Sequence, residues 1–252
     1  MTLEKNLLQL KRRTTLHSGF IRQWPLSSFG LPLSVGSPSD LFQEEISFEY
    51  MQQVFGIMQR THWYTYLLST SCAERLEELA PALPWPANVW MGVTVEVAEH
   101  KQRIDCLRRI GAAFKFVSFE PLIGDIGTLN LDGIDWVTIG GEIGANARPM
   151  AYRWVQNIFC QCAGDWRGGP DVPVHFSRWG EWLSHRLLHQ HQLPTRKTEV
   201  QIIQNAGPDE IEVMFRVGKA RAAGTLCPCT AYHPQFPKTL VCKGEKYASK
   251  NV

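Results

Sequence analysis

Short apolar runs that each stop at a glutamate recur three times in the middle of this 252-residue chain. The runs occupy residues 90–96, 116–120 and 136–142, and they end at Glu96, Glu120 and Glu142. Continuous apolar runs of this length are typical of strands that are buried on both faces of a parallel sheet. Active sites of parallel α/β barrels lie at the carboxyl ends of such strands. We therefore expect the three carboxylates to lie close together at that end of the barrel. We take these three glutamates as candidate catalytic residues.

Composition narrows the class of protein. Apolar residues make up 44% of the chain and charged residues 20%, which favours a sizeable core over wholesale disorder. The formal net charge of +2 is too small to imply a nucleic-acid partner. No apolar run approaches the ~20 residues of a membrane span, and no apolar segment follows the first basic residues as in a secretory signal. We therefore expect a cytoplasmic protein without a membrane partner, with its seven cysteines reduced.

Strand-like and helix-like segments alternate from residue 33 onward. The expected strands are residues 33–35, 64–69, 89–95, 114–119, 136–139 and 172–176, and the expected helices are residues 47–60, 73–79, 98–110 and 152–162. This alternation indicates right-handed β-α-β units and a parallel sheet. We expect an α/β fold with a partial parallel (β/α) barrel, TIM-barrel-like.

Three regions follow from this pattern. Residues 1–32 lack a clear period and form an irregular N-terminal segment, and residues 33–182 form the partial barrel. Residues 183–252 form a C-terminal extension that ends in an irregular tail. Within that extension, residues 200–203 and 211–215 are strand-like segments on either side of the turn Gly207-Pro208-Asp209, which predicts a hairpin.

A glycine-rich segment follows the third of the glutamate-ended strands. Gly140 and Gly141 let the backbone approach a ligand closely, and a helix start favours a bound anion. Arg148 is placed to clamp a phosphate or carboxylate with two hydrogen bonds. Gly140, Gly141, Glu142 and Arg148 are therefore candidate cofactor-binding residues. The alternative is a tight turn in which Glu142 and Arg148 pair with each other.

The other candidate positions also have structural explanations. Glu96 and Glu120 serve either as acid, base or metal ligand, or as partners of an arginine such as Arg103. Arg178 and Trp179 are candidate substrate-binding residues, because a guanidinium and an aromatic ring together stack on an adenine or another base. The alternative for this tryptophan-rich segment is a plug at the end of the barrel.

The cysteine pattern does not predict a metal site. Cys227 and Cys229 flank a proline, but no further Cys pair or nearby histidine completes four ligands. We therefore assign no metal-ligating residue.

Six motifs in order are similar to those of a known family. They are Ser39-Asp40-Leu41-Phe42, residues 85–96, Phe119-Glu120-Pro121-Leu122, Gly140-Gly141-Glu142 through Met150, Trp179-Gly180-Glu181-Trp182, and Arg216-Val217-Gly218-Lys219 with Ala222-Ala223-Gly224. The set resembles an uncharacterised phage- and prophage-associated family, related to radical S-adenosylmethionine enzymes, that has a three-cysteine motif. The resemblance runs from about residue 33 to about residue 237 and implies a partial barrel, which here is expected to lack its first β-α unit. It also implies a [4Fe–4S] cluster and S-adenosylmethionine that is cleaved to a carbon radical.

The chain departs from that family at the iron-binding loop. The family's cluster cysteines lie after the first strand, whereas no cysteine here precedes Cys72. Three thiolates are needed to hold such a cluster. Two of the family's lysines are also replaced, one in the segment 70–73 and one at Ser177. As written, the chain is expected to carry no cofactor.

Three hypotheses for the function remain open. The first is a degenerate or truncated member of this radical-type family, without radical chemistry, that keeps a nucleotide-sized pocket. The second is a nucleic-acid-binding module of phage origin that uses the basic termini and the tryptophan-rich segment. The third is a metal-dependent enzyme that uses the strand-end glutamates, since oxygen ligands suit magnesium or manganese.

Overall fold

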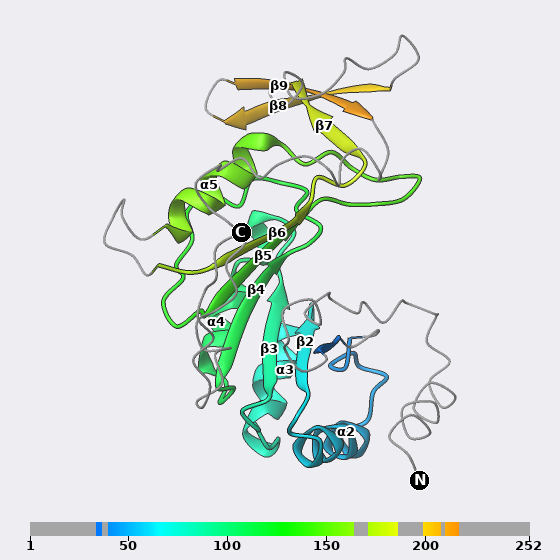
Figure 1. The fold of residues 1–252 in the computed structure, drawn as a ribbon, viewed down its shortest axis with the longest axis vertical. Helices are drawn as coiled ribbons and strands as arrows, with labels where there is room; N and C mark the ends of the chain where they lie inside the picture. Colours follow the sequence, from blue (N-terminus) through cyan, green and yellow to red (C-terminus); the bar gives the residue numbers. More distant parts are fainter. Residues whose placement is uncertain (1–33, 37–39, 164–170, 186–198, 208–209, 217–252) are drawn as a thin grey trace, which may run out of the picture.

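Six parallel strands form the main sheet of this computed structural model, which describes residues 34–36, 40–163, 171–185, 199–207 and 210–216. The strands are β1 (Ser34–Gly36), β2 (Thr65–Thr70), β3 (Val89–Thr94), β4 (Phe114–Phe119), β5 (Trp136–Gly140) and β6 (Val174–Arg178). Each strand pairs with the next in the sequence, in the order β1-β2-β3-β4-β5-β6 (Figure 1). The predicted α/β class with a parallel sheet is confirmed, and closure into a barrel stays a prediction.

Helices connect most of these strands. They are α2 (Phe48–Arg60), α3 (Ala73–Leu79), α4 (Gln102–Arg109) and α5 (Tyr152–Cys162), with 3₁₀ turns η2 (Ala80–Ala82) and η3 (Ala98–His100). Ser47 caps the N-terminus of α2, because its Oγ accepts the backbone N–H of Tyr50. The single helix expected over residues 98–110 is instead η3 followed by α4.

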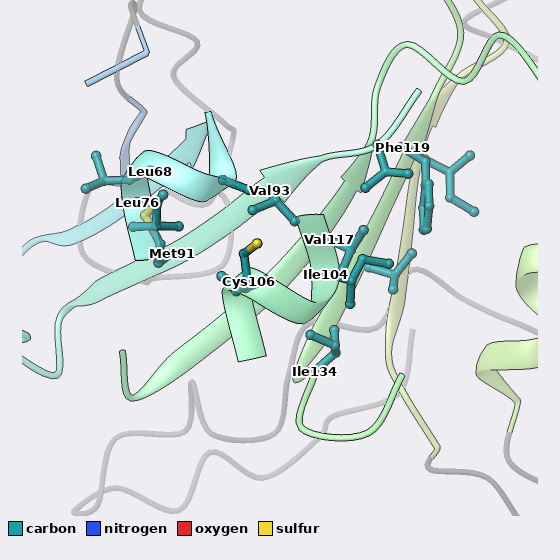
Figure 2. Close-up of a cluster of buried hydrophobic side chains, with 14 of the residues drawn as sticks. Leu68, Leu76, Met91, Val93, Ile104, Cys106, Val117, Phe119 and Ile134 are labelled. Atoms are coloured by element: carbon teal, nitrogen blue, oxygen red, sulfur yellow. The ribbon is translucent and has the colours of Figure 1, made fainter. Parts of the chain in front are cut away.

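One face of the main sheet forms the large core with the helices. Met91 and Val93 of β3 and Val117 of β4 pack there with Leu76 of α3 and Ile104 of α4 (Figure 2). Successive side chains of a strand point to opposite faces, so the residues between these point away from the helices. The strand sequences are therefore apolar on the helix side because that side carries the core.

An aromatic cluster covers part of the opposite face. It consists of Leu67, Trp90, Phe114, Phe116 and Trp136, which all come from strands β2 to β5. The rings of Trp90 and Phe114 stack at 3.8 Å between centroids. The cluster lies toward the beginnings of the strands, so it leaves the second half of this face to other side chains.

A second, smaller sheet follows the main one. Its strands are β7 (Trp182–Ser184), β8 (Val200–Gly207) and β9 (Glu210–Arg216), antiparallel in the order β7-β9-β8. Figure 1 shows this sheet beside α5 at one end of the molecule. The pairing of β8 with β9 confirms the predicted hairpin, whereas β7 was not expected. The irregular segment predicted for residues 1–32, the basic termini, and Cys227 and Cys229 lie outside the described residues.

A search of the described helices for one that is long and apolar enough to cross a bilayer finds none.

Candidate functional site

A row of hydroxyl groups crosses the second half of the helix-free face. Thr94, Ser118 and Thr138 stand in register on β3, β4 and β5, and His175 of β6 continues the row. Ser69 Oγ on β2 lies 3.0 Å from Thr94 Oγ1, and Thr138 Oγ1 donates to Ser118 Oγ at 3.1 Å. We call Ser69, Thr94, Ser118 and Thr138 the hydroxyl row. It is a polar strip, buried at Thr138 and partly exposed elsewhere, between the aromatic cluster and the carboxyl ends of the strands.

Glu120 stands at the end of β4 and pairs with an arginine from β6. Arg178 Nη2 donates to Glu120 Oε2 at 3.3 Å, and the two side chains are only 18% and 12% exposed. Burial lowers the pKa of His175, while the Glu120 carboxylate raises it and Arg178 lowers it. The imidazole of His175 is therefore favoured in its neutral form beside a buried ion pair.

Glycine at position 140 makes room for this group. A Cβ on Gly140 would lie 2.8 Å from Glu120 Oε2 and closer still to Ser177 Oγ. Ser177 is the extra residue of a β-bulge, because Ile139 pairs with Phe176 and the next pair is Gly140 with Arg178. The bulge re-aims the end of β6, so Arg178 reaches across to the end of β4.

Glu96 lies two residues after β3 and has two partners. Arg103 Nη1 donates to Glu96 Oε2 at 2.9 Å and to the carbonyl of Thr94 at 2.6 Å. His100 Nδ1 lies 2.6 Å from the same carboxylate oxygen. The arginine pairing considered from the sequence is therefore present for this glutamate.

Glu142 lies in the loop after β5, and Arg148 closes on it. The guanidinium donates from Nε to Glu142 Oε2 and from Nη2 to Oε1, each at 2.8 Å, and the Arg148 backbone N–H also donates to Oε2. These hydrogen bonds hold the pKa of Glu142 below its usual range. Arg148 is 56% exposed and Glu142 26% exposed, so solvent reaches the outer side of the pair.

Backbone hydrogen bonds bring the three strand ends to one edge of the sheet. Just after Glu120, the N–H of Leu122 donates to the carbonyl of Gly140, and the N–H of Ile123 donates to that of Glu96. The pKa of Arg148 is raised by its hydrogen bonds to Glu142 and, to a smaller extent, by the charge of Glu96. A backbone hydrogen bond thus links the segment after Glu120 to Glu96. The charge of Glu96 also acts on Arg148, which is the partner of Glu142.

The glycines of the loops after β5 and β6 pack against each other. Gly141 N–H donates to the carbonyl of Arg178 at 2.9 Å. Gly180 has a φ of 87°, and a Cβ there would collide with the carbonyl of Glu142. The two loops therefore approach at backbone distance. Trp179, between them, is 1% exposed, and its ring packs against Tyr152 and Phe176.

The described cysteines do not fit an iron–sulfur cluster. Cys72 caps α3, Cys106 lies in α4, and Cys160 and Cys162 lie in α5. Burial raises the pKa of Cys72 and Cys162 and raises that of Cys106 to about 11. Among the described residues, no three His, Cys, Asp or Glu side chains gather in a way that holds a metal ion.

Sequence reasoning missed the residues that surround the strand-end glutamates. The members of the hydroxyl row, with His175 and Ser177, lie near the ends of strands that are otherwise mostly apolar. The signal in the sequence is therefore a Ser, Thr or His within a mostly apolar strand, at a position that faces away from the helices. Tryptophan and phenylalanine on the same face of these strands hide this signal.

Comparison with known protein families matches residues 13–231 to the family described as Protein of unknown function (DUF5131). No curated protein and no solved structure matches the chain.

Proposed function

We propose that this chain, which belongs to the family of unknown function matched above, binds a nucleotide-sized ligand with an anionic group at the carboxyl edge of its main sheet. The proposal includes descent from the radical S-adenosylmethionine-type family that its six motifs resemble, without radical chemistry in the chain as written. The candidate site residues are Glu96, Glu120, Glu142, Arg148 and Arg178.

The observation that carries the proposal is the set of three arginine–glutamate pairs beside the hydroxyl row. Each strand-end carboxylate already holds a guanidinium, from Arg103, Arg178 or Arg148. An incoming phosphate or carboxylate competes for such guanidinium groups, because arginine recognises both with paired hydrogen bonds. The hydroxyl row supplies donors and acceptors for the uncharged part of the ligand.

The chemistry available to the described residues is binding and proton transfer. Glu120 is placed to accept a hydrogen bond or a proton from a ligand, with Arg178 fixing its orientation. His175, favoured as a neutral base, lies beside that pair. Since the described cysteines do not suit a cluster, no step is assigned to iron.

Ligand-induced stabilisation tests this function directly. A ligand that binds the folded state alone raises the melting temperature, so the wild type is titrated with S-adenosylmethionine, S-adenosylhomocysteine and ATP. Arg148→Gln should weaken binding by roughly tenfold, the loss expected for a charge-assisted hydrogen bond of ~1.4 kcal/mol. A wild-type melting temperature that stays constant with all three ligands contradicts the proposal.

Arg109 provides the matched control for that variant. Like Arg148, it is more than half exposed and forms a bidentate pair with a glutamate, Glu77, but it joins α4 to α3. Arg109→Gln should leave ligand binding unchanged. Equal losses in the two variants would show a general effect of charge removal rather than a site at Arg148.

The absence of radical chemistry is tested separately. Anaerobic reconstitution with iron and sulfide should give no stoichiometric cluster, because no cysteine precedes Cys72. A protein that gains the broad visible absorption of a [4Fe–4S] cluster, with four irons per chain, would overturn this part of the proposal and leave the binding site in place.

A further inference from the structure

Side chains of the small sheet donate hydrogen bonds to the loop that carries the Glu142–Arg148 pair. Trp182 of β7 is almost fully buried, and its Nε1 donates to the carbonyl of Ala147 at 2.6 Å. Arg216 at the end of β9 donates from Nη2 to the carbonyls of Gly144 and Ala145. The backbone of the loop is thus held at Gly144, Ala145 and Ala147 by two side chains from the small sheet.

Further contacts fix the two ends of the same loop. Glu181, just before β7, accepts the backbone N–H of Gly144 at 3.2 Å. Glu212 of β9 is fully buried, and its Oε1 accepts the N–H of Tyr152 at 2.7 Å, at the first residue of α5. Ala147 also packs in one cluster with Trp182 and Met214.

Arg216 is itself held in a fixed orientation. Its guanidinium lies over the Trp182 ring at 5.9 Å from the centroid, and its Nη1 donates to Glu199 at 2.8 Å. With its plane near the ring and Nη1 on a carboxylate, the guanidinium directs Nη2 at the loop carbonyls. The side chain of Arg216 therefore holds the loop backbone in one position rather than moving freely in solvent.

The position of Arg148 depends on these contacts between the small sheet and the loop, because its own side chain has few other contacts. Its side chain is 56% exposed, and the hydrogen bonds that its guanidinium makes are those to Glu142. A pair that is half in water is worth little alone, since solvent screens the charges. The conformation of the backbone between Glu142 and Arg148 must therefore bring the two side chains together.

We propose that the small sheet is a positioning element for Arg148, and that Arg216 is its central positioning residue. Arg216 and Trp182 hold the loop in the conformation in which Arg148 closes on Glu142. Because the proposed ligand competes for Arg148, this inference rests on the proposed function for its biological meaning. The geometric claim is independent of any ligand.

Side-chain NMR of the ligand-free protein tests that claim. In the wild type, the Nε–H of Arg148 should exchange slowly with water, because it donates to Glu142 Oε2. In Arg216→Met, which keeps the side-chain stem over Trp182, the exchange should accelerate by roughly tenfold, the equivalent of ~1.4 kcal/mol of lost closure. Arg216→Lys, which can still donate to the loop carbonyls, should restore part of the protection.

The same spectra contain an internal control. The Nε–H of Arg109 in α4 donates to Glu77 in α3, neither of which contacts Arg216, so its exchange should not change in any Arg216 variant. A folded Arg216→Met protein with unchanged exchange at Arg148 overturns the inference. If that variant does not fold, Trp182→Phe, which removes the bond to Ala147 and keeps a ring, decides the question by the same readout. Failure of ligand binding in the wild type would contradict the proposed function and leave these exchange rates unaffected.

Discussion

At the scale of single residues, the strand-end glutamates are organised by arginines. The pairs Glu96–Arg103 and Glu142–Arg148 join residues close in sequence, so both were foreseeable as alternatives from spacing alone. Arg178 reaches Glu120 from 58 residues away through the bulge at Ser177, and no local pattern predicts that contact. The catalytic and ligand-binding roles of these residues stay predictions.

His175 should make the stability of the protein depend on pH. Burial lowers its pKa in the folded state, whereas the unfolded residue titrates near ~6.5. Below that value the unfolded state binds more protons, so stability is full above it and is lost as pH falls toward the folded pKa. His175→Gln should remove this component. Urea unfolding of both proteins from neutral to mildly acidic pH measures it, and parallel profiles would contradict the prediction.

At the scale of elements, apolar runs predicted most of the main sheet. The strands and helices from α2 to β6 lie close to the expected positions. Each contributes apolar residues to the core, and these residues form recognisable runs or helical repeats in the sequence. The three-residue strand β7 was missed, since it is too short to show a period and exists by pairing with β9. The break between η3 and α4 was also missed, because Lys101 offers no proline or glycine signal.

Gly180 should tolerate substitution less well than another glycine with a similar backbone. Both Gly180 and Gly133 have positive φ, 87° and 71°, so alanine costs ~1–2 kcal/mol at either position. A Cβ at Gly133 meets Arg108 at an ordinary 3.6 Å, whereas at Gly180 it collides with the backbone of the β5–α5 loop. Gly180→Ala should therefore lower the free energy of unfolding further than Gly133→Ala. Equal losses in chemical denaturation would show that the two loops do not pack as described.

At the scale of the whole molecule, the two sheets share buried contacts. Glu212 brings a carboxylate from the small sheet to the first turn of α5, where backbone N–H groups lack helical partners. Trp182 adds an apolar contact with Ala147 on the same side. The described parts of both sheets are therefore expected to unfold together rather than as separate domains.

Glu212 should be important for this connection. Glu212→Ala leaves the N–H of Tyr152 without its acceptor, which should cost ~1–3 kcal/mol, and it should speed amide hydrogen exchange in the first turn of α5. Glu212→Gln keeps an acceptor oxygen and should cost less. Thermal unfolding monitored at tryptophan and amide exchange of α5 provide the measurements. A Glu212→Ala protein as stable as the wild type would show that the contact carries no energy.

The strand order has a consequence for synthesis on the ribosome. Every neighbour within the main sheet is also the neighbour in the chain, so each β-α unit can add to an existing template as it emerges. The bond between Tyr152 and Glu212, by contrast, spans 60 residues and must wait for β9. The loop that carries Arg148 can therefore reach its final conformation only after the main sheet has formed and β9 has left the ribosome.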